Sequence, residues 1–485
     1  MRTPASIEAR THAAAQLLAL DAAARRDHLV GAAPQEYPRP PDARTFAEDA
    51  RAALALDPAA AALLAEAWLT ASTRHALARR EAALAARPLA LRGEARPLPA
   101  RGALSAALSE RNGARREAIL VALDDRMRDE RERAREAVEA IRAAVDALDP
   151  ALRDALLPHE DADAVLAATD DLWRELDARA LRWLELDPSR VRWGDRLHAL
   201  HGPSVPAQVP PATWSALAVD WWERVGLDLA LRGVRDALDA SSREAAGVHA
   251  IVTEPGARAT LAGRTSPSAW GAAEVLGAGS VAVGAVLARG LWAAHRRGVD
   301  RVSDGALHAL GRRLLHDRSF LRRAAMVDAA ARERVMLEAL HAELARVRLD
   351  AALGRFVRDA LDRAPELGAR FVAQVTRAWG VAPSPGWAVH LAADALASGG
   401  ALGAMWGRRA AGSSVEVALR ERLRARFDED WHRNPHVGEW LRGALDALRG
   451  LGWRGWLEAE GVDARAGGAA LAKRLAEDFD EARRG

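Results

Sequence analysis

The sequence predicts a mostly α-helical protein with one small β insertion. Half of the 485 residues are apolar and only 5% are aromatic, and Ala, Leu, Arg and Glu favour helix over strand. The pairs Asp57–Pro58, Asp149–Pro150 and Asp187–Pro188 each place a capping residue before a proline, which is typical of helix starts. Val248–Leu261, VHAIVTEPGARATL, holds β-branched residues around a Pro-Gly turn, so we expect a small hairpin there.

Prolines and glycines divide the first part of the chain into helical segments. YPRPP at Tyr37–Pro41 is expected to be a rigid connector, and the helix that opens at Asp57–Pro58 is expected to run to about Ala86. Arg87–Gly102 contains three prolines and two glycines and predicts a loop. A long, highly charged helical pattern follows, from about Leu104 to Leu148.

The rest of the chain continues this pattern. The glycine and prolines of Gly202–Pro211 predict another loop. A long helix is expected over about Asp328–Arg363, with four apolar residues at core-facing spacing: Leu337, Leu340, Leu344 and Val347. No repeat of fixed period is evident. The length suits one large helical body or two to four domains.

Charge and composition argue against several classes of function. The 69 basic and 67 acidic residues are interspersed, for a net charge of +2, so no basic face for nucleic acid is expected. The chain has no cysteine, which excludes disulfides and thiol chemistry. The N-terminal segment lacks the long uncharged core of a secretory signal, and the longest uncharged run, Val275–Ala288, is short for a bilayer span. We therefore expect a cytoplasmic protein without nucleic-acid or membrane partners.

The most informative segment is Ala272–Ala288, AAEVLGAGSVAVGAVLA. It has the length of a helix, and Glu274 is its only charged residue and its only candidate metal ligand. Gly277, Gly279 and Gly284 do not fit a dinucleotide-binding turn, because they lie inside the apolar helix and the third spacing is wrong. We expect these small residues to allow close helix packing.

Two other residue sets limit the available chemistry. The sixteen tryptophans, including Trp221–Trp222, are expected to be core and groove anchors, and Tyr37 is the only tyrosine. No phenol can therefore stabilise an oxyanion downstream of residue 37. His432 and His436 are four residues apart, with acidic residues at 428–430, but Pro435 disfavours the helix on which both imidazoles would converge on a metal.

Two segments suggest a relative. Val417–Trp453, which contains FDEDWHRNPHVGEW, resembles the end of zinc peptidases of the oligoendopeptidase F and thimet oligopeptidase family, and Ala164–Leu186 resembles a helix of that family. A hairpin followed by an apolar helix also matches its order of elements. The resemblance implies a helical bowl with a deep channel. The resemblance covers roughly Ala164 to the C-terminus and implies an oligopeptidase-like lobe over 151–485, with a degenerate zinc helix near 272–288. Residues 1–150 are expected to form an N-terminal helical lobe.

In that family a helix carries His-Glu-x-x-His, whose imidazoles bind zinc and whose glutamate is the general base. The resemblance lays this motif over Leu276–Ser280, so that Leu276 and Ser280 replace the histidines and Gly277 replaces the base. The third ligand falls near Asp304. The Pro-Gly-aromatic turn of the family is kept at Pro385–Trp387, and Trp387 and His390 are the candidate cleft-lining residues.

These observations lead to one preferred function and two alternatives. We expect a catalytically inactive oligopeptidase-like protein without a cofactor, which binds peptides or a partner protein in the former cleft. One alternative is a zinc-dependent oligopeptidase with a relocated metal site, for example at His432 and His436. The other is a helical scaffold that makes no use of the cleft.

Overall fold

The structure is a computed structural model of residues 1–485. The residues it describes are 4–29, 43–85, 88–91, 97–98, 103–104, 106–107, 110, 112–156, 162–201, 212–238, 247–263, 265, 268–291, 296, 301–324, 328–384, 386–387, 389–390 and 404–484. The expected connector at Tyr37–Pro41 and the expected loop at Gly202–Pro211 lie outside these residues, as does most of Arg87–Gly102.

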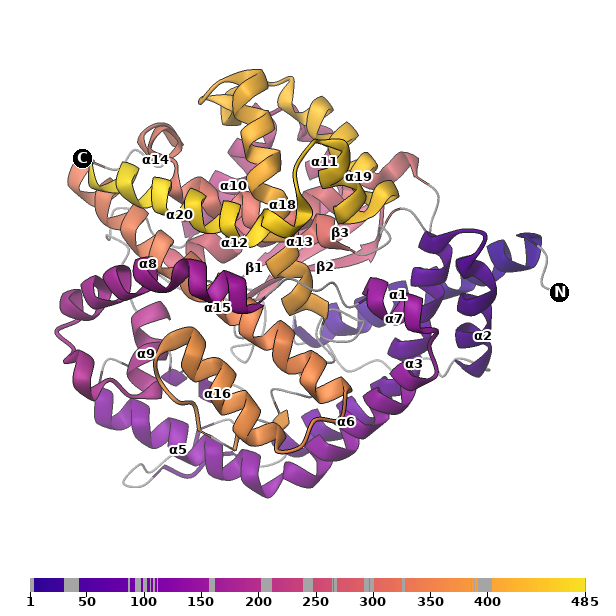
Figure 1. The fold of residues 1–485 in the computed structure, drawn as a ribbon, viewed down its shortest axis with the longest axis horizontal. Helices are drawn as coiled ribbons and strands as arrows, with labels where there is room; N and C mark the ends of the chain where they lie inside the picture. Colours follow the sequence, from indigo (N-terminus) through magenta and orange to yellow (C-terminus); the bar gives the residue numbers. More distant parts are fainter. Residues whose placement is uncertain are drawn as a thin grey trace.

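The predicted fold class is confirmed, because helices dominate and one small sheet interrupts them (Figure 1). The N-terminal helices are α1 (Pro4–Leu29), α2 (Ala43–Leu54), α3 (Pro58–Ala85), α5 (Gly113–Asp129), α6 (Arg131–Asp146) and α7 (Pro150–Leu156). The middle of the chain forms α8 (Ala162–Trp183), η1 (Pro188–Arg190), α9 (Trp193–His201), α10 (Ala212–Arg224), α11 (Asp228–Leu231), α12 (Ala269–Leu287), η2 (Ala288–Gly290), α13 (Val302–Arg312), η3 (Arg313–His316) and α14 (Arg318–Ala324). The C-terminal part forms α15 (Ala329–Leu361), α16 (Leu367–Trp379), α18 (Ala404–Phe427), η4 (Trp431–Arg433), α19 (Val437–Ala459), η5 (Ala464–Ala466) and α20 (Gly467–Arg483).

Helix α15 runs through the middle of the molecule and contacts α8, α12, α16, α18 and α20 (Figure 1). It begins after Asp328, whose side chain accepts a hydrogen bond from the backbone N–H of Ala331 at 2.9 Å. This confirms the predicted helix, and its four core-facing residues are all buried. One hydrophobic core extends from the N-terminal helices to the C-terminal ones, and the division at residue 150 stays a prediction.

The capping signals predicted helix starts better than helix lengths. Helix α3 begins at Pro58, and Asp57 accepts hydrogen bonds from the N–H groups of Ala59 at 2.8 Å and Ala60 at 3.1 Å, as expected. Asp187–Pro188 opens only a single 3₁₀ turn, in which Asp187 accepts from the N–H of Ser189 at 2.9 Å.

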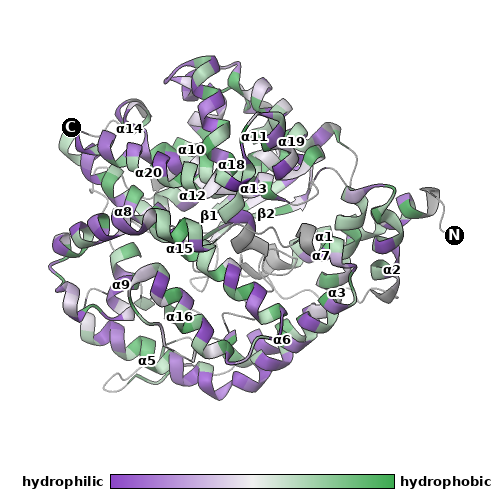
Figure 2. Ribbon diagram, in the orientation of Figure 1, coloured by the Kyte–Doolittle hydropathy of each residue, from purple (hydrophilic) through white to green (hydrophobic). Residues whose placement is uncertain are grey.

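The helical pattern predicted from about Leu104 to Leu148 is largely helical, but it is not one continuous helix. Two helices, α5 and α6, meet at Glu130, whose φ of −95° and ψ of 16° leave the helical region. Helix α5 starts only at Gly113, because Asn112 caps it by accepting a hydrogen bond from the N–H of Arg115 at 3.1 Å. In Figure 2 the two helices carry many hydrophilic residues along the outer edge of the molecule.

The hairpin predicted over Val248–Leu261 is confirmed. Strands β2 (Val248–Glu254) and β3 (Arg258–Gly263) pair antiparallel around the Pro-Gly turn. A third strand, β1 (Val234–Leu238), was not predicted and pairs parallel to β3, which gives the order β1-β3-β2. Its sequence, VRDAL, lacks a β-branched run, so its strand conformation comes from pairing with β3. Helices α1 and α12 both contact this sheet.

Helix α12 is almost entirely buried in the centre of the protein. Among the described helices it is the only one long and apolar enough to cross a membrane, but 89% of its apolar window is buried within the protein. A Cβ atom on Gly277 would lie 2.8 Å from Cδ2 of His308 and 2.9 Å from its carbonyl oxygen, and one on Gly284 would overlap Leu307. Close packing against α13 is thus confirmed at Gly277 and Gly284, whereas Gly279 has ordinary space.

The predicted role of the tryptophans as core anchors is confirmed for five of them: Trp214, Trp221, Trp222, Trp431 and Trp456 are among the largest fully buried side chains. The rings of Trp221 and Trp222 lie 4.0 Å apart. Trp221 also meets Trp431 edge-on at 6.3 Å, which ties α10 to η4.

Replacing Gly311 with alanine tests the contact between α12 and α13. The added methyl would overlap Oγ of Ser280 and the backbone carbonyl of Leu276, so we expect a loss of about 1–3 kcal/mol in the free energy of unfolding. Gly443→Ala in α19 is the matched control, because no atom lies within 4 Å of its new methyl, and it should stabilise by up to about 1 kcal/mol. Urea denaturation measures both, and equal effects would contradict the close contact.

Candidate functional site

The three residues aligned with the zinc motif lie where α12 packs against α13. Leu276 and Ser280 are fully buried, and Gly277 faces His308 and Arg312 of α13. The hydroxyl of Ser280 donates to the carbonyl of Leu276 in its own helix at 2.7 Å. The only polar side chain among the three is therefore already bonded to the backbone.

Asp304, the expected position of a third ligand, lies elsewhere on α13. It is one turn before His308 and interacts electrostatically with Arg449 of α19. Arg449 in turn donates to the carbonyl of Gly284 at 2.7 Å, about two helical turns beyond Gly277. The structure therefore does not bring Asp304 beside Leu276 or Gly277.

Trp387 and His390 lie in a buried turn against the N-terminal helices. Trp387 is 4% exposed and His390 is fully buried. Nε2 of His390 lies 2.8 Å from the carbonyl oxygen of Met127 in α5, and Arg80 of α3 donates to the carbonyl of His390 at 2.9 Å. These two hydrogen-bond contacts connect His390 to α3 and α5.

A different set of residues converges on α12, which we call the α12 charge cluster: Glu274, His308, Arg312, Glu343 and Arg346. Glu274 forms an ion pair with Arg346 of α15, and its Oε2 lies 3.7 Å from Nε2 of His308. Arg312 contacts Nδ1 of His308 and makes a bidentate pair with Glu343, with N–O distances of 2.7 and 2.9 Å. All five side chains are at least nine-tenths buried.

The charges of the cluster follow from burial and from the neighbouring arginines. Burial by itself raises the pKa of Glu274, but Arg346 and the hydrogen bond with His308 hold it well below its ordinary value. In Glu343, Arg312 and Arg313 likewise outweigh burial and lower the pKa. Burial, with Arg312 beside it, lowers the pKa of His308 to about 3. At neutral pH the cluster therefore holds two carboxylates, a neutral imidazole and charged guanidinium groups.

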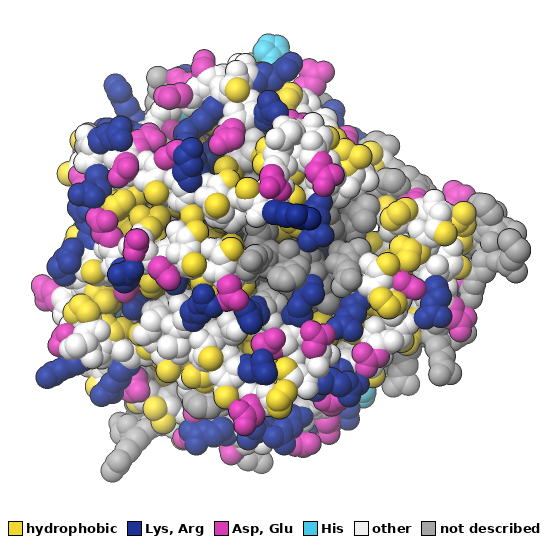
Figure 3. Space-filling view, in the orientation of Figure 1, with side chains coloured by type: hydrophobic (Ala, Val, Ile, Leu, Met, Phe, Trp, Pro, Cys, Tyr) yellow, Lys and Arg dark blue, Asp and Glu magenta, His cyan; other side chains and the backbone are white. Residues whose placement is uncertain are grey.

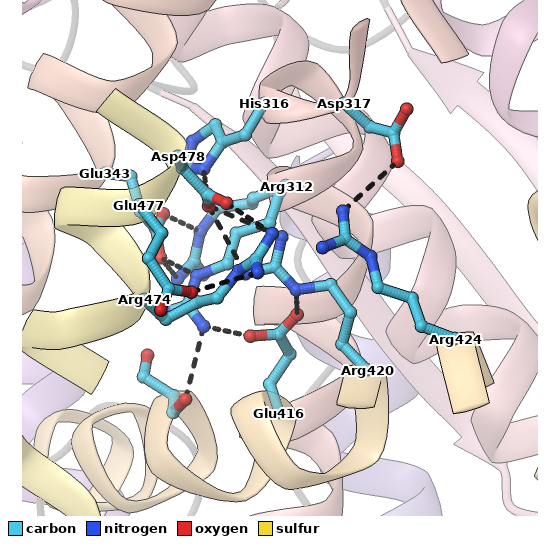
Figure 4. Close-up of polar contacts among 12 residues, drawn as sticks. Arg312, His316, Asp317, Glu343, Glu416, Arg420, Arg424, Arg474, Glu477 and Asp478 are labelled. Atoms are coloured by element: carbon cyan, nitrogen blue, oxygen red, sulfur yellow. Dashed lines mark hydrogen bonds and ion pairs between the residues drawn. The ribbon is translucent and has the colours of Figure 1, made fainter. Parts of the chain in front are cut away.

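Ion pairs continue from this cluster to the C-terminal helix (Figure 4). Arg313 links Glu343, at 3.2 Å, to Glu416 of α18. The ion pairs beyond it are Glu416–Arg420 at 3.1 Å, Arg420–Asp478 at 3.3 Å and Arg474–Asp478 at 2.7 Å. Nδ1 of His316 also lies 3.2 Å from a carboxylate oxygen of Asp478. Helices α12, α13, α15, α18 and α20 are thereby joined by one buried chain of charges.

The alternative metal site at His432 and His436 does not form a ligand set. His432 is buried in η4, with its Nε2 3.4 Å from the hydroxyl of Ser319 and its ring against Phe320. His436 lies at the exposed start of α19. Across the described part of the chain, which includes 428–436, no three His, Cys, Asp or Glu residues are arranged to hold a metal ion.

The residues around α12 do not fit a zinc ion either. Catalytic zinc needs three protein ligands and an open position. The available donors are Glu274, His308 and Glu343, and each of them already accepts a hydrogen bond or an ion pair from an arginine. These guanidinium groups also repel a divalent cation.

One buried carboxyl group stands apart from this network. Asp350 of α15 is fully buried, and within the described structure neither of its carboxylate oxygens has a hydrogen-bond partner. Burial raises its pKa to about 7, although Arg409, Arg312 and Arg346 act in the opposite direction. Asp350 is therefore the member of this region that changes charge near neutral pH.

Sequence reasoning singled out Glu274 but missed the other cluster residues. Glu343, Arg346 and Asp350 recur at intervals of three and four, which places them on one face of α15. They alternate with the core residues Leu344 and Val347. Charged residues interleaved at core spacing were the available signal of a buried ionic network.

The sequence matches no known protein family and no curated protein. Its structure is similar to several solved peptidases. Metallocarboxypeptidase 1 of Trypanosoma cruzi matches over 98% of both chains, with a TM-score of 0.51 and 12% identity. A structure assigned as oligoendopeptidase F matches over 91% of this chain and 84% of its own, with a TM-score of 0.56 and 12% identity. PZ peptidase A with an inhibitor matches over 92% and 80%, with a TM-score of 0.54 and 11% identity.

The chain therefore has a peptidase-like fold. The match to the trypanosomal protein covers nearly all of this chain, so it includes the N-terminal helices as well as the region from Ala164 onwards.

The pH dependence of stability tests the state of Asp350. Its pKa rises from 3.8 to about 7 on folding, so the folded protein keeps a proton that the unfolded chain releases. Asp350 therefore lowers stability by roughly 1 kcal/mol per pH unit as the pH rises from about 4 to 7, with no further loss above 7. Asp350→Asn removes this loss, and its stability relative to wild type should rise between pH 5 and 7.

Burial lowers the pKa values of His308 and His341 to about 3, so these two residues make stability rise with pH in both proteins. The difference between variant and wild type removes their contribution. Urea denaturation at pH 5, 6, 7 and 8 measures the difference. A difference that does not change with pH would refute the raised pKa of Asp350.

Proposed function

We propose that this protein is a catalytically inactive relative of the metallopeptidases that share its fold, and that it binds peptides or a partner protein in the former cleft. The observation that carries the proposal is the position of Leu276, Gly277 and Ser280. These residues pack against α13, and the one hydroxyl among them is bonded to the backbone.

The chemistry of peptide hydrolysis supports inactivity. A zinc peptidase needs three ligands, a base that activates water and donors for the oxyanion. The aligned positions supply no imidazole and no base, and the chain has no tyrosine after Tyr37. The nearest imidazole, on His308, is engaged by Glu274 and Arg312.

Retention of the fold supports a remaining binding role. The chain matches a metallocarboxypeptidase over nearly its whole length although only 12% of the aligned residues are identical. Clefts of this kind can bind ligands through their framework after the reacting groups are lost. A peptide or protein segment is the ligand class that the fold suggests, and a nucleic acid or membrane partner is not proposed. Figure 3 shows acidic and basic side chains interspersed over one face of the molecule.

A zinc-dependent oligopeptidase with a divergent metal site is the competing function, because one of the similar structures is named as a metallopeptidase. A cytoplasmic location remains our prediction for either function.

Metal content and peptidase activity separate the two functions. We expect the purified protein to hold less than stoichiometric zinc, because no ligand set is available at α12. We also expect no cleavage of internally quenched peptides, with or without added zinc, while an active zinc peptidase assayed in parallel loses activity with a chelator. Stoichiometric zinc together with chelator-sensitive cleavage would show that the protein is an enzyme.

Calorimetric titration with a library of peptides about ten residues long tests the binding role. We expect a subset to bind with dissociation constants in the micromolar range, which is on the order of 8 kcal/mol of binding free energy. Single amino acids at the same concentration serve as the control and should give no heat of binding. If no peptide in the library binds, the peptide-binding role is rejected.

A further inference from the structure

The α12 charge cluster and the neighbouring Trp270 contain the groups that bind a cation: two carboxylates and an aromatic ring. We infer that α12 and α15 form an internal cation site, and that the guanidinium group of Arg346 permanently occupies it in place of a free ion. The inference rests on the proposed absence of a catalytic metal from this region. It goes further by assigning the positive charge there to one side chain of the chain itself.

Two carboxylates and one aromatic ring contact the guanidinium group of Arg346. Glu274 of α12 forms an ion pair with Nη2, and Oε2 of Glu343 lies 3.7 Å from Nη1. The guanidinium carbon lies 3.9 Å from the ring centroid of Trp270, also on α12. Two carboxylates and an aromatic face are the groups that bind a desolvated organic cation in proteins. The Arg346 side chain is only 3% exposed, so the guanidinium group is enclosed rather than resting on the surface.

The charges of the neighbours make Arg346 the necessary partner of Glu274. Glu343 is also held by Arg312 and Arg313, at 2.7 and 3.2 Å. Glu274 has no comparable second pair among the described contacts, since His308 lies 3.7 Å away and stays neutral. Loss of the guanidinium group would therefore leave the ionised, buried Glu274 without its direct ion-pair partner, and only the electrostatic interactions with Arg409 and Arg312 would offset its charge.

The position of Arg346 also explains why a divalent ion does not fit. The Arg346 guanidinium lies between the carboxylates of Glu274 and Glu343 and contacts both. An incoming metal would have to displace a charged side chain that is only 3% exposed. We therefore expect the site to accept a planar organic cation of the size of guanidinium.

Chemical rescue tests this assignment. Arg346→Ala empties the site, and we expect the melting temperature to fall by about 5–10 °C. Methylguanidinium at millimolar concentration should recover at least half of that fall, because it can refill the cavity. Tetramethylammonium at the same concentration should recover none of it, since this tetrahedral cation lacks the planar face that stacks on the ring of Trp270.

Arg348→Ala is the matched control on the same helix. Arg348 is equally buried, but its guanidinium mainly donates to backbone carbonyls, at 2.7 Å to Ala378 and 2.9 Å to Leu166. Its ion-pair partner, Asp170, is half exposed. We expect the melting temperature of this variant to fall, and methylguanidinium should not restore it. Equal rescue of both variants, or no rescue of a folded Arg346→Ala protein, would overturn the inference.

A second comparison covers the case in which Arg346→Ala does not fold. In Arg346→Met with Glu274→Gln, the cation and the charge that needs it are both removed, so this double variant should melt at a higher temperature than Arg346→Met alone. A double variant that melts at or below the single one would also overturn the inference. Zinc found in the wild-type protein would refute the proposed function, whereas a metal-free protein without rescue would refute only the assignment of Arg346.

Discussion

The structure around α12 depends on one electrostatic constraint, which is that Glu274 is ionised inside the protein. A buried carboxylate is stable only beside a positive charge or several hydrogen-bond donors. Arg346 of α15 supplies that charge, and Glu343, Arg312 and Arg313 extend the pairing across α13 and α15. From there the ion pairs reach Asp478 in α20, so buried ion pairs connect five helices.

Close packing of α12 against α13 complements this network. Gly277, Gly284 and Gly311 allow the two backbones to approach, and Ser280 turns its hydroxyl onto its own helix. A pair of imidazoles on α12 would not fit against α13 at this separation. The small residues of α12 therefore account for its close contact with α13. The chain has a peptidase-like fold, and its core holds paired arginines and glutamates around α12.

Local signals in the sequence predicted the fold well where their cause is local. Asp57 caps α3 and Asp328 caps α15 through hydrogen bonds to the first turn, and the Pro-Gly turn forms the hairpin of β2 and β3. The break at Glu130 and the strand β1 were missed, because the first has no proline or glycine and the second depends on pairing with β3. The site could be predicted only in part. An alignment of motifs drew attention to Asp304, whereas the long-range contacts that bring His308, Arg312 and Arg346 to Glu274 are a property of the folded chain.

We propose that the guanidinium groups of arginine side chains, and no metal ion, supply the positive charge beside α12. A crystal soaked in zinc, with anomalous diffraction recorded on both sides of the zinc absorption edge, tests this directly. We expect no anomalous peak within coordination distance of Glu274, Gly277, Ser280 or His308. A strong peak there, with the side chain of Arg346 displaced from Glu274, would contradict it.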